Sequence, residues 1–226
     1  MCKAGFDWLA VDLEHSAITI REAEELIRII DLSGSTPLVR LTSNNVDQIK
    51  RVMDSGAHGV IVPMVNSVLD AEKAVSAVYY PPRGSRGVGL ARAQGYGETF
   101  NHYIEWLNEN AVVIVQIEHI DAVSNLKDII SVNGIDGFII GPYDLSASMG
   151  IPGQFDNSKF IDVIKNINEI TSSTSLARGV HIIEPDTEKL IQCINENYSF
   201  IAYSLDIRML DTGCREPISL KNSIKK

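Results

Sequence analysis

The chain has 226 residues, of which 45% are hydrophobic and 22% are charged, a balance typical of a globular enzyme. This length suits one domain, because barrels of about 200–250 residues often form a single unit. The formal net charge of −9 argues against nucleic acid as a partner, since phosphates require a basic surface. It also provides no polybasic patch for an acidic membrane.

The cysteines and the N-terminal residues indicate the cellular environment in which the protein works. Cys2, Cys193 and Cys214 are far apart and odd in number, so the sequence suggests neither a disulfide framework nor a zinc pair. Met1–Gly5 contains no apolar signal core. No apolar run approaches the roughly 20 residues that span a bilayer. We therefore expect a cytosolic protein with reduced thiols and no membrane partner.

Short apolar segments alternate with amphipathic segments along the whole chain. The predicted strands are Trp8–Asp12, Thr36–Arg40, Gly59–Pro63, Ala111–Glu118, Gly137–Gly141, Gly179–Ile183 and Phe200–Ser204. The predicted helices are Ile20–Asp31, Asn45–Ser55, Ser67–Val78 and Asn157–Ser172. The stretch Tyr79–Phe100 is irregular and rich in Gly, Pro and Arg, and we expect it to hold a structured active-site loop.

This order of elements predicts an α/β fold. Continuous apolar strands that alternate with helices indicate a parallel sheet buried on both faces. Their number favours a closed TIM (β/α)8-type barrel over an open doubly wound sheet. We count seven βα units where the closed barrel has eight, and we expect the first unit, at the N-terminus, to be the one that is lacking. Residues 1–226 are predicted to form a single domain.

Polar residues collect where the predicted strands end, and in a barrel these carboxyl ends carry the catalytic groups. Four strands contribute. The residues are Asp12, Glu14, His15, Arg40, Gln116, Glu118, Tyr143 and Asp144. One charged residue at a strand end is often only solvated, but delivery from four strands to one rim predicts a functional site. We call this set the carboxyl-end rim.

Glu118 and Asp144 are the predicted metal ligands. Two carboxylates with water and substrate oxygens suit a hard divalent ion such as Mg²⁺ or Mn²⁺. The alternative is that Glu118 forms a structural ion pair with a nearby arginine.

His15 is the candidate proton carrier, because an imidazole titrates near neutral pH. Asp12, three residues earlier, is placed to hold the other ring nitrogen and fix the tautomer. The other histidines are interpreted as structural or surface residues: His58, His102, His119 and His181.

Arg40 is a permanent cation with several donors, suited to an enolate oxygen or a carboxylate. Its alternative role is a salt bridge at the rim. The turn Gly141–Ser146 leads into a predicted short helix, whose first backbone N–H groups can hold a carboxylate.

Several ordered motifs together resemble one known family. They are Gly5–Trp8, Asp12–His15, Pro37–Arg40, Gly56–Ala57, Ile61–Val65, Tyr80–Gly84, Arg86–Gly89, Val115–Glu118, Gly137–Ser146 and Met149–Gly150. From roughly Gly5 to Leu210 the chain resembles the HpcH/HpaI family, the class II pyruvate aldolases typified by 4-hydroxy-2-oxoheptanedioate aldolase. Each motif alone is of moderate specificity, and the ordered set is specific.

The resemblance implies a TIM barrel and a homohexamer built as a trimer of dimers, with the C-terminal helix exchanged between partners. It implies that Glu118 and Asp144 hold a divalent metal ion, Mg²⁺ or Mn²⁺ with Co²⁺ also possible. It further implies that His15, oriented by Asp12, transfers a proton.

For the substrates, the resemblance implies a 2-oxo acid and an aldehyde. Arg40 and Gln116 would contact the keto or enolate oxygen of pyruvate, and the amides of Tyr143 and Asp144 its carboxylate. Metal and Arg40 together would stabilise negative charge on the 2-oxo oxygen. None of the predicted strands ends in a lysine that could form a Schiff base, which fits the metal-dependent route.

The sequence departs from the family pattern at Tyr143, where a small residue or Asn is usual, and at Ala202–Asp206, where a Gly often precedes the Asp. Two other functions stay open. One is a CoA-thioester lyase of the citrate lyase β-subunit type, to which the acidic balance gives little support. The other is a catalytically inactive barrel scaffold, which has no need of the acidic, His and Arg residues at the rim. No motif specifies the aldehyde.

Overall fold

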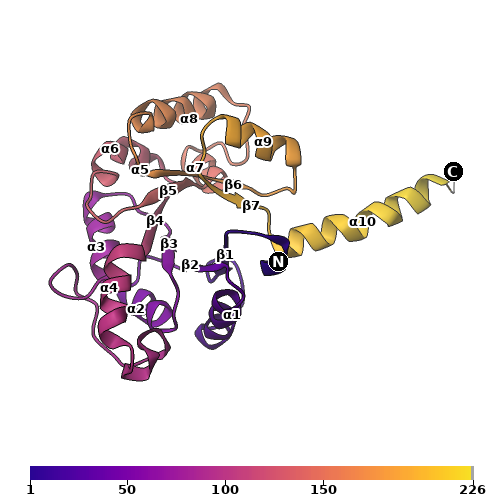
Figure 1. Ribbon diagram of the computed structural model, residues 1–226. Helices are drawn as coiled ribbons and strands as arrows, with labels where there is room; N and C mark the ends of the chain where they lie inside the picture. Colours follow the sequence, from indigo (N-terminus) through magenta and orange to yellow (C-terminus); the bar gives the residue numbers. More distant parts are fainter. Residues whose placement is uncertain (225–226) are drawn as a thin grey trace.

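A computed structural model describes residues 1–224 and contains one seven-stranded parallel sheet in the order β1 to β7 (Figure 1). Its strands are β1 Trp8–Asp12, β2 Thr36–Arg40, β3 Gly59–Val62, β4 Val112–Ile117, β5 Gly137–Ile140, β6 Ala177–Ile182 and β7 Phe200–Tyr203. Each predicted strand is confirmed to within two residues. The predicted α/β class and parallel sheet are therefore confirmed, and β1 and β7 form the two edges of the sheet.

Helices cover the outside of the curled sheet (Figure 1). They are α1 Ile20–Leu32, α2 Val46–Asp54, α3 Val68–Val78, α4 Phe100–Asn110, α5 Ile120–Ser124, α6 Leu126–Ile129, α7 Pro142–Ser148, α8 Ser158–Thr171, α9 Thr187–Asn195 and α10 Asp206–Ile224, with short 3-10 turns η1 Cys2–Ala4 and η2 Arg92–Gly97. The four predicted helices are confirmed as α1, α2, α3 and α8. α4, α5, α6 and α9 lie in segments where no helix was predicted.

The helix starts follow local capping rules. Thr19 and Glu22 form a capping box at α1, in which each side chain bonds the other residue's backbone N–H. Asn45 and Ser67 accept backbone N–H groups at the starts of α2 and α3. These caps satisfy donors that have no partner inside the helix, so the sequence itself fixes where these helices begin.

The sheet buries apolar side chains on both faces. Its concave face carries a cluster made by Leu38, Ile61, Ile114, Ile139 and Phe200, against which Trp8, Val112, Ala177 and Ala202 pack. The rings of Trp8 and Phe200 stack with centroids 4.4 Å apart, which links the two edge strands. Residues of the opposite parity, such as Val113 and Phe138, pack against the helices. This alternation decides which residues at the strand ends point into the concavity.

α10 differs from the other helices because it projects away from the body of the molecule (Figure 1). None of its residues is buried. Its large apolar side chains are exposed: Ile207, Leu210, Ile218, Leu220 and Ile224. Within residues 1–224, no helix combines the length and apolar character needed to cross a membrane.

The irregular segment after α3 is anchored by Arg86, whose side chain is fully buried. Its guanidinium donates to Asp54 Oδ1 at 3.1 Å, to Tyr103 Oη at 2.8 Å and to the Val78 carbonyl at 3.0 Å. It also lies over the Tyr80 ring, 4.5 Å from the centroid. Because α3 runs back along the sheet, this segment lies at the amino ends of the strands. Within this chain, the segment predicted to be an active-site loop therefore does not reach the carboxyl-end rim.

We predict that Arg86→Met lowers the free energy of unfolding by about 3 kcal/mol, since it leaves buried acceptors without their charged donor. Urea denaturation measures this change. Arg83→Met is the matched control: Arg83 lies 3.6 Å above the Tyr79 ring but is exposed, so its loss should cost less than about 1 kcal/mol. Equal effects of the two substitutions would refute a structural role for the buried guanidinium.

Candidate active site

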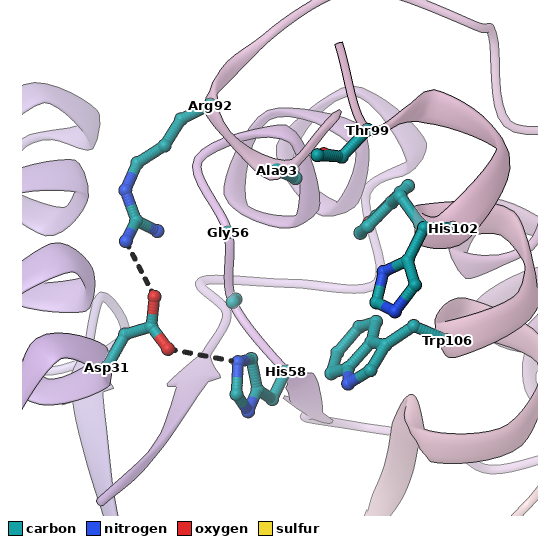
Figure 2. Close-up of a pocket in the computed structure, with 10 residues that line it drawn as sticks. Asp31, Gly56, His58, Arg92, Ala93, Thr99, His102 and Trp106 are labelled. Atoms are coloured by element: carbon teal, nitrogen blue, oxygen red, sulfur yellow. Dashed lines mark hydrogen bonds and ion pairs between the residues drawn. The ribbon is translucent and has the colours of Figure 1, made fainter. Parts of the chain in front are cut away.

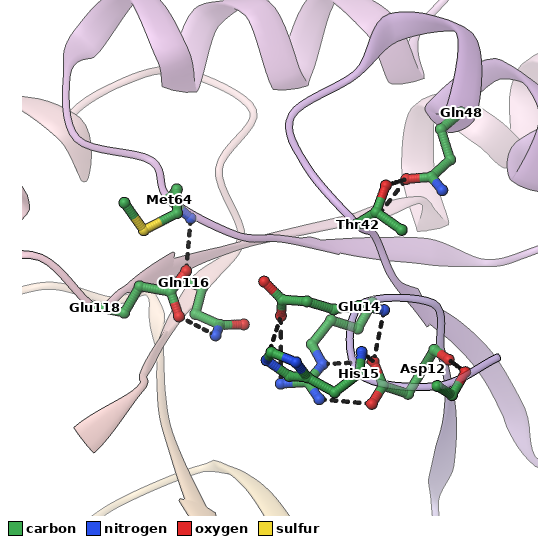
Figure 3. Close-up of polar contacts among 10 residues, drawn as sticks. Asp12, Glu14, His15, Thr42, Gln48, Met64, Gln116 and Glu118 are labelled. Atoms are coloured by element: carbon green, nitrogen blue, oxygen red, sulfur yellow. Dashed lines mark hydrogen bonds and ion pairs between the residues drawn. The ribbon is translucent and has the colours of Figure 1, made fainter. Parts of the chain in front are cut away.

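The strand register brings four polar side chains together at the carboxyl-end rim. Leu38 and Ile114 point into the concave face, so Arg40 and Gln116, two residues further along the same strands, point the same way. Asp12 is paired with Arg40 across β1 and β2 and shares its side of the sheet. Glu118 follows Gln116 by two residues and continues this line. Figure 3 shows Asp12 on one side of the rim and Gln116 and Glu118 on the other.

Asp12 and Arg40 form a two-point ion pair. Arg40 Nε donates to Asp12 Oδ1 at 2.9 Å and Nη2 donates to Oδ2 at 2.6 Å. Burial by itself would raise the pKa of Asp12, but the hydrogen bonds and charge of Arg40 outweigh it and lower that pKa. Asp12 is therefore ionised at neutral pH, and the pair joins the ends of β1 and β2.

Asp12 contacts His15 through the backbone. Its Oδ1 accepts the backbone N–H groups of Glu14 at 3.0 Å and His15 at 3.4 Å. The His15 imidazole is 63% exposed, and its Nε2 lies 3.8 Å from Glu14 Oε2. Asp12 thus shapes the turn that carries His15, and the carboxylate next to the ring belongs to Glu14.

Glu118 is 2% exposed and is held at both oxygens (Figure 3). Oε1 accepts the Met64 backbone N–H at 2.7 Å, and Oε2 accepts a hydrogen bond from the Gln116 amide. Met64 adopts a left-handed backbone with φ of 53°, a strained conformation for a side-chain-bearing residue that aims its N–H at Glu118. Burial, with a smaller effect from the charge of Asp144, raises the pKa of Glu118 above its ordinary value.

Asp144 lies in the first turn of α7, directly after β5. Its neighbour Tyr143 is 54% exposed and meets Phe155 edge-on, with ring centroids 4.9 Å apart. At Gly141, a Cβ atom would lie 2.9 Å from Glu118 Oε2. The glycine therefore keeps open the space between the end of β5 and the Glu118 carboxylate.

The Glu118 and Asp144 pair suits a divalent cation. Burial and the charge of Asp144 both raise the pKa of Glu118, and a cation near both carboxylates would stabilise their charged forms. Carboxylate oxygens are also the donors that Mg²⁺ and Mn²⁺ prefer. Across residues 1–224, no group of three or more His, Cys, Asp or Glu side chains is arranged to hold a metal, so water and substrate oxygens would complete the coordination.

Glu14 belongs to this site, although the sequence analysis gave it no role. Its Oε2 is buried without a hydrogen-bond partner and lies 3.5 Å from Arg40 Nη1. Burial, followed by the charge of Glu118, raises the pKa of Glu14 to about 7, against the opposing effect of Arg40. The only sequence signal was its place between Asp12 and His15.

His181 also faces the site, whereas the sequence analysis treated it as structural or surface. It pairs with Ala202 across β6 and β7, and Ala202 packs on the concave face. Burial lowers the pKa of His181, and the charge of Arg40 lowers it further. Side chains alternate between the two faces along β6, and this alternation could have predicted that His181 points into the concave face.

A second hollow lies at the other end of the molecule and contains none of the predicted site residues. This cavity of about 270 Å³ is lined in part by Asp31, His58, Arg92 and Trp106 (Figure 2). Asp31 accepts from Arg92 at 2.6 Å and lies 3.4 Å from His58 Nε2. Its central charges therefore satisfy each other and tie α1 to η2, which gives them a structural role.

We predict that Glu14 makes the metal-free protein less stable as pH rises. Its folded-state pKa of about 7 exceeds the ordinary value of 4.5, so the stability it contributes is present below about pH 4.5 and is lost through pH 7. Between pH 5 and 8 in EDTA, wild type should lose up to about 3 kcal/mol relative to Glu14→Gln. Urea denaturation tests this, with Glu25→Gln on the exposed side of α1 as the charge-matched control. Parallel pH profiles for wild type and Glu14→Gln would contradict it.

Comparison with known proteins places this arrangement in context. The 2-keto-3-deoxy-L-rhamnonate aldolase of Escherichia coli (strain K12) is 33% identical over 224 residues, which are 98% of this chain and 83% of that protein. An HpcH/Hpal aldolase/citrate lyase family protein from Burkholderia cenocepacia J2315 is similar in structure, with a TM-score of 0.91, 28% identity and coverage of 98% of this chain and 88% of the other. The citrate synthase SbnG has a TM-score of 0.85 and 25% identity, and the match covers 99% of this chain and 87% of the other.

The family model matches nearly the whole described chain. It is the HpcH/HpaI aldolase/citrate lyase model, and it spans residues 1–211, a range that includes every residue of the rim. The relatives named as aldolases are lyases, in agreement with a carbon–carbon lyase. The chain therefore belongs to the HpcH/HpaI aldolase/citrate lyase family.

Proposed function

We propose that this protein is a divalent-metal-dependent class II aldolase that cleaves or forms 4-hydroxy-2-oxo acids, with pyruvate and an aldehyde as the smaller partners. The observation that carries the proposal is the buried Glu118 carboxylate, on which the charge of Asp144 acts, at the same strand ends as the Asp12–Arg40 ion pair. The name of the E. coli relative, an aldolase for a 2-keto-3-deoxy sugar acid, supports the same substrate class.

We assign each residue of the rim a role according to its position. Glu118 and Asp144 would hold a cation such as Mg²⁺ or Mn²⁺, which would supply Lewis-acid stabilisation of negative charge on the 2-oxo oxygen. Arg40 adds a fixed positive charge that Asp12 holds in place. Gln116 donates a hydrogen bond to Glu118, and we assign it a contact with the 2-oxo oxygen. The backbone N–H groups of Tyr143 and Asp144 at the start of α7 are placed for the substrate carboxylate.

Proton transfer falls to the turn after β1. His15 is exposed, and its Nε2 lies 3.8 Å from Glu14 Oε2. Carbon–carbon cleavage requires removal of the hydroxyl proton on C4 and return of a proton to C3 of pyruvate. We assign both steps to the imidazole of His15, which accepts the first proton and then returns one.

We predict that the protein exchanges the methyl protons of pyruvate with D₂O when Mg²⁺ is present, because exchange requires the enolate but no aldehyde. NMR of pyruvate measures the rate. Glu118→Gln and His15→Ala should each lower it by about 100-fold or more, and EDTA should abolish it. Glu105→Gln, an exposed change on α4, is the control and should leave the rate unchanged.

A folded protein that binds Mg²⁺ and still shows no exchange would refute pyruvate as the donor. The similarity to a citrate synthase would then direct the search to another carbonyl donor. The inactive-scaffold alternative predicts in addition that Mn²⁺ with pyruvate causes no thermal shift.

We also propose that the sheet is the greater part of a (β/α)8 barrel, that residues 1–226 form one domain, and that the chain assembles as a trimer of dimers with α10 exchanged between partners. The support is the exposed apolar row on α10, since exposed apolar surface of this extent marks a protein interface.

If α10 docks on a second copy, Ile207→Ser with Leu210→Ser should shift the protein to smaller species, because both side chains lose apolar burial at the interface. Light scattering coupled to gel filtration measures the mass. Lys221→Ser, on the same helix, is the control and should keep the wild-type mass. A wild-type protein that is monomeric at micromolar concentration would overturn this proposal.

A further inference from the structure

We propose that His181 contacts the acceptor aldehyde and selects aldehydes that carry a hydroxyl group next to the carbonyl carbon. This inference rests on the proposed function and adds a specificity-determining residue to it. It places the donor on the β2, β4 and β5 side of the concavity and the acceptor on the β6 and β7 side.

The position of His181 follows from the packing of β6. Ala177 packs against the concave cluster. A Cβ on Gly179, two residues further, would lie 3.0 Å from the Ile139 Cβ, and Ile139 belongs to the same cluster. His181 continues this face by two more residues. Ala177 and Gly179 thus precede the imidazole on its strand, with no long side chain on the same face.

His181 lies at the same height along the strands as the residues of the carboxyl-end rim. Ile117 pairs with Ile140, and Ile140 pairs with Val180, so His181 is level with Glu118, one residue further along each strand. The charges of Arg40 and Asp12 also act on its imidazole. The opposing contribution from the Ser204 backbone, a hydrogen-bond partner, is smaller than that of burial. The imidazole is therefore neutral at pH 7, with one donor and one acceptor nitrogen.

Glu118 and Arg40, on the proposed donor side of the rim, already have partners. Glu118 binds Met64 and Gln116, and Arg40 binds Asp12. The Ser204 backbone can engage only one of the two ring nitrogens of His181, which leaves the second for a ligand. A neutral imidazole pairs with a hydroxyl as donor or acceptor, whereas a methyl group at the same place would leave it unpaired in a half-buried site.

Two aldehydes of similar size that differ in one hydroxyl group test the role of His181 most directly. Glycolaldehyde and propanal differ by a hydroxyl in place of a methyl group and are close in size. With pyruvate and Mg²⁺, we expect His181→Leu to lower kcat/KM for glycolaldehyde by about 10-fold or more, relative to its effect on propanal. His181→Gln, which keeps hydrogen-bonding groups, should retain part of the preference. His102→Leu removes an exposed imidazole on α4 and is the control.

Pyruvate proton exchange separates this inference from the function on which it rests. In His181→Leu the exchange rate should stay within about 2-fold of wild type, because the donor side is intact; this also shows that the variant is folded. Equal loss for both aldehydes, or no loss for either, would overturn the role of His181. Absence of exchange in the wild type would instead overturn the proposed function. If His181→Leu does not fold, the glycolaldehyde-to-propanal ratio of His181→Gln decides: a ratio equal to that of wild type refutes the inference.

Discussion

The ion pair between Asp12 and Arg40 is the interaction on which the rest of the rim depends. It joins the ends of β1 and β2 through two short hydrogen bonds. The same Asp12 carboxylate holds the backbone of the turn that carries Glu14 and His15. Because Asp12 is buried only together with its partner, removal of either side chain would leave a charge without compensation. One pair therefore fixes both the position of the Arg40 guanidinium and the shape of the turn after β1.

Around this pair the rim has more acidic than basic side chains. Glu14, Glu118 and Asp144 lie near one another, and the single guanidinium of Arg40 faces Glu14 while it is engaged with Asp12. Burial and mutual repulsion raise the pKa of both glutamates. Such a concentration of carboxylates is unfavourable unless a cation joins it. The same arrangement therefore lowers stability and underlies the proposal that a divalent cation binds here.

The two ends of the sheet have separate tasks. At the carboxyl ends, polar side chains face the concavity and are only partly satisfied by one another. At the amino ends, buried Arg86 and the Asp31–Arg92 pair satisfy their own charges and anchor the long segment after α3. This division matches the general rule for parallel α/β barrels, in which chemistry lies at the carboxyl ends and stability at the opposite face. It allows the rim to keep strained features such as the Met64 backbone, because the packing elsewhere holds the strands.

The sequence by itself determined the strands, the main helices, the parallel order and most of the rim. Apolar runs, capping residues and turns are local signals, so Glu118, Arg40 and Asp144 were found from their places at strand ends. Only the tertiary structure decided that Asp12 binds Arg40 and the His15 backbone, that Glu14 is buried beside them, and that His181 faces the same space. Those facts depend on strand register and on the curvature that brings β6 opposite β2. Register and curvature arise from packing between residues far apart in the chain, and no short stretch of sequence encodes them.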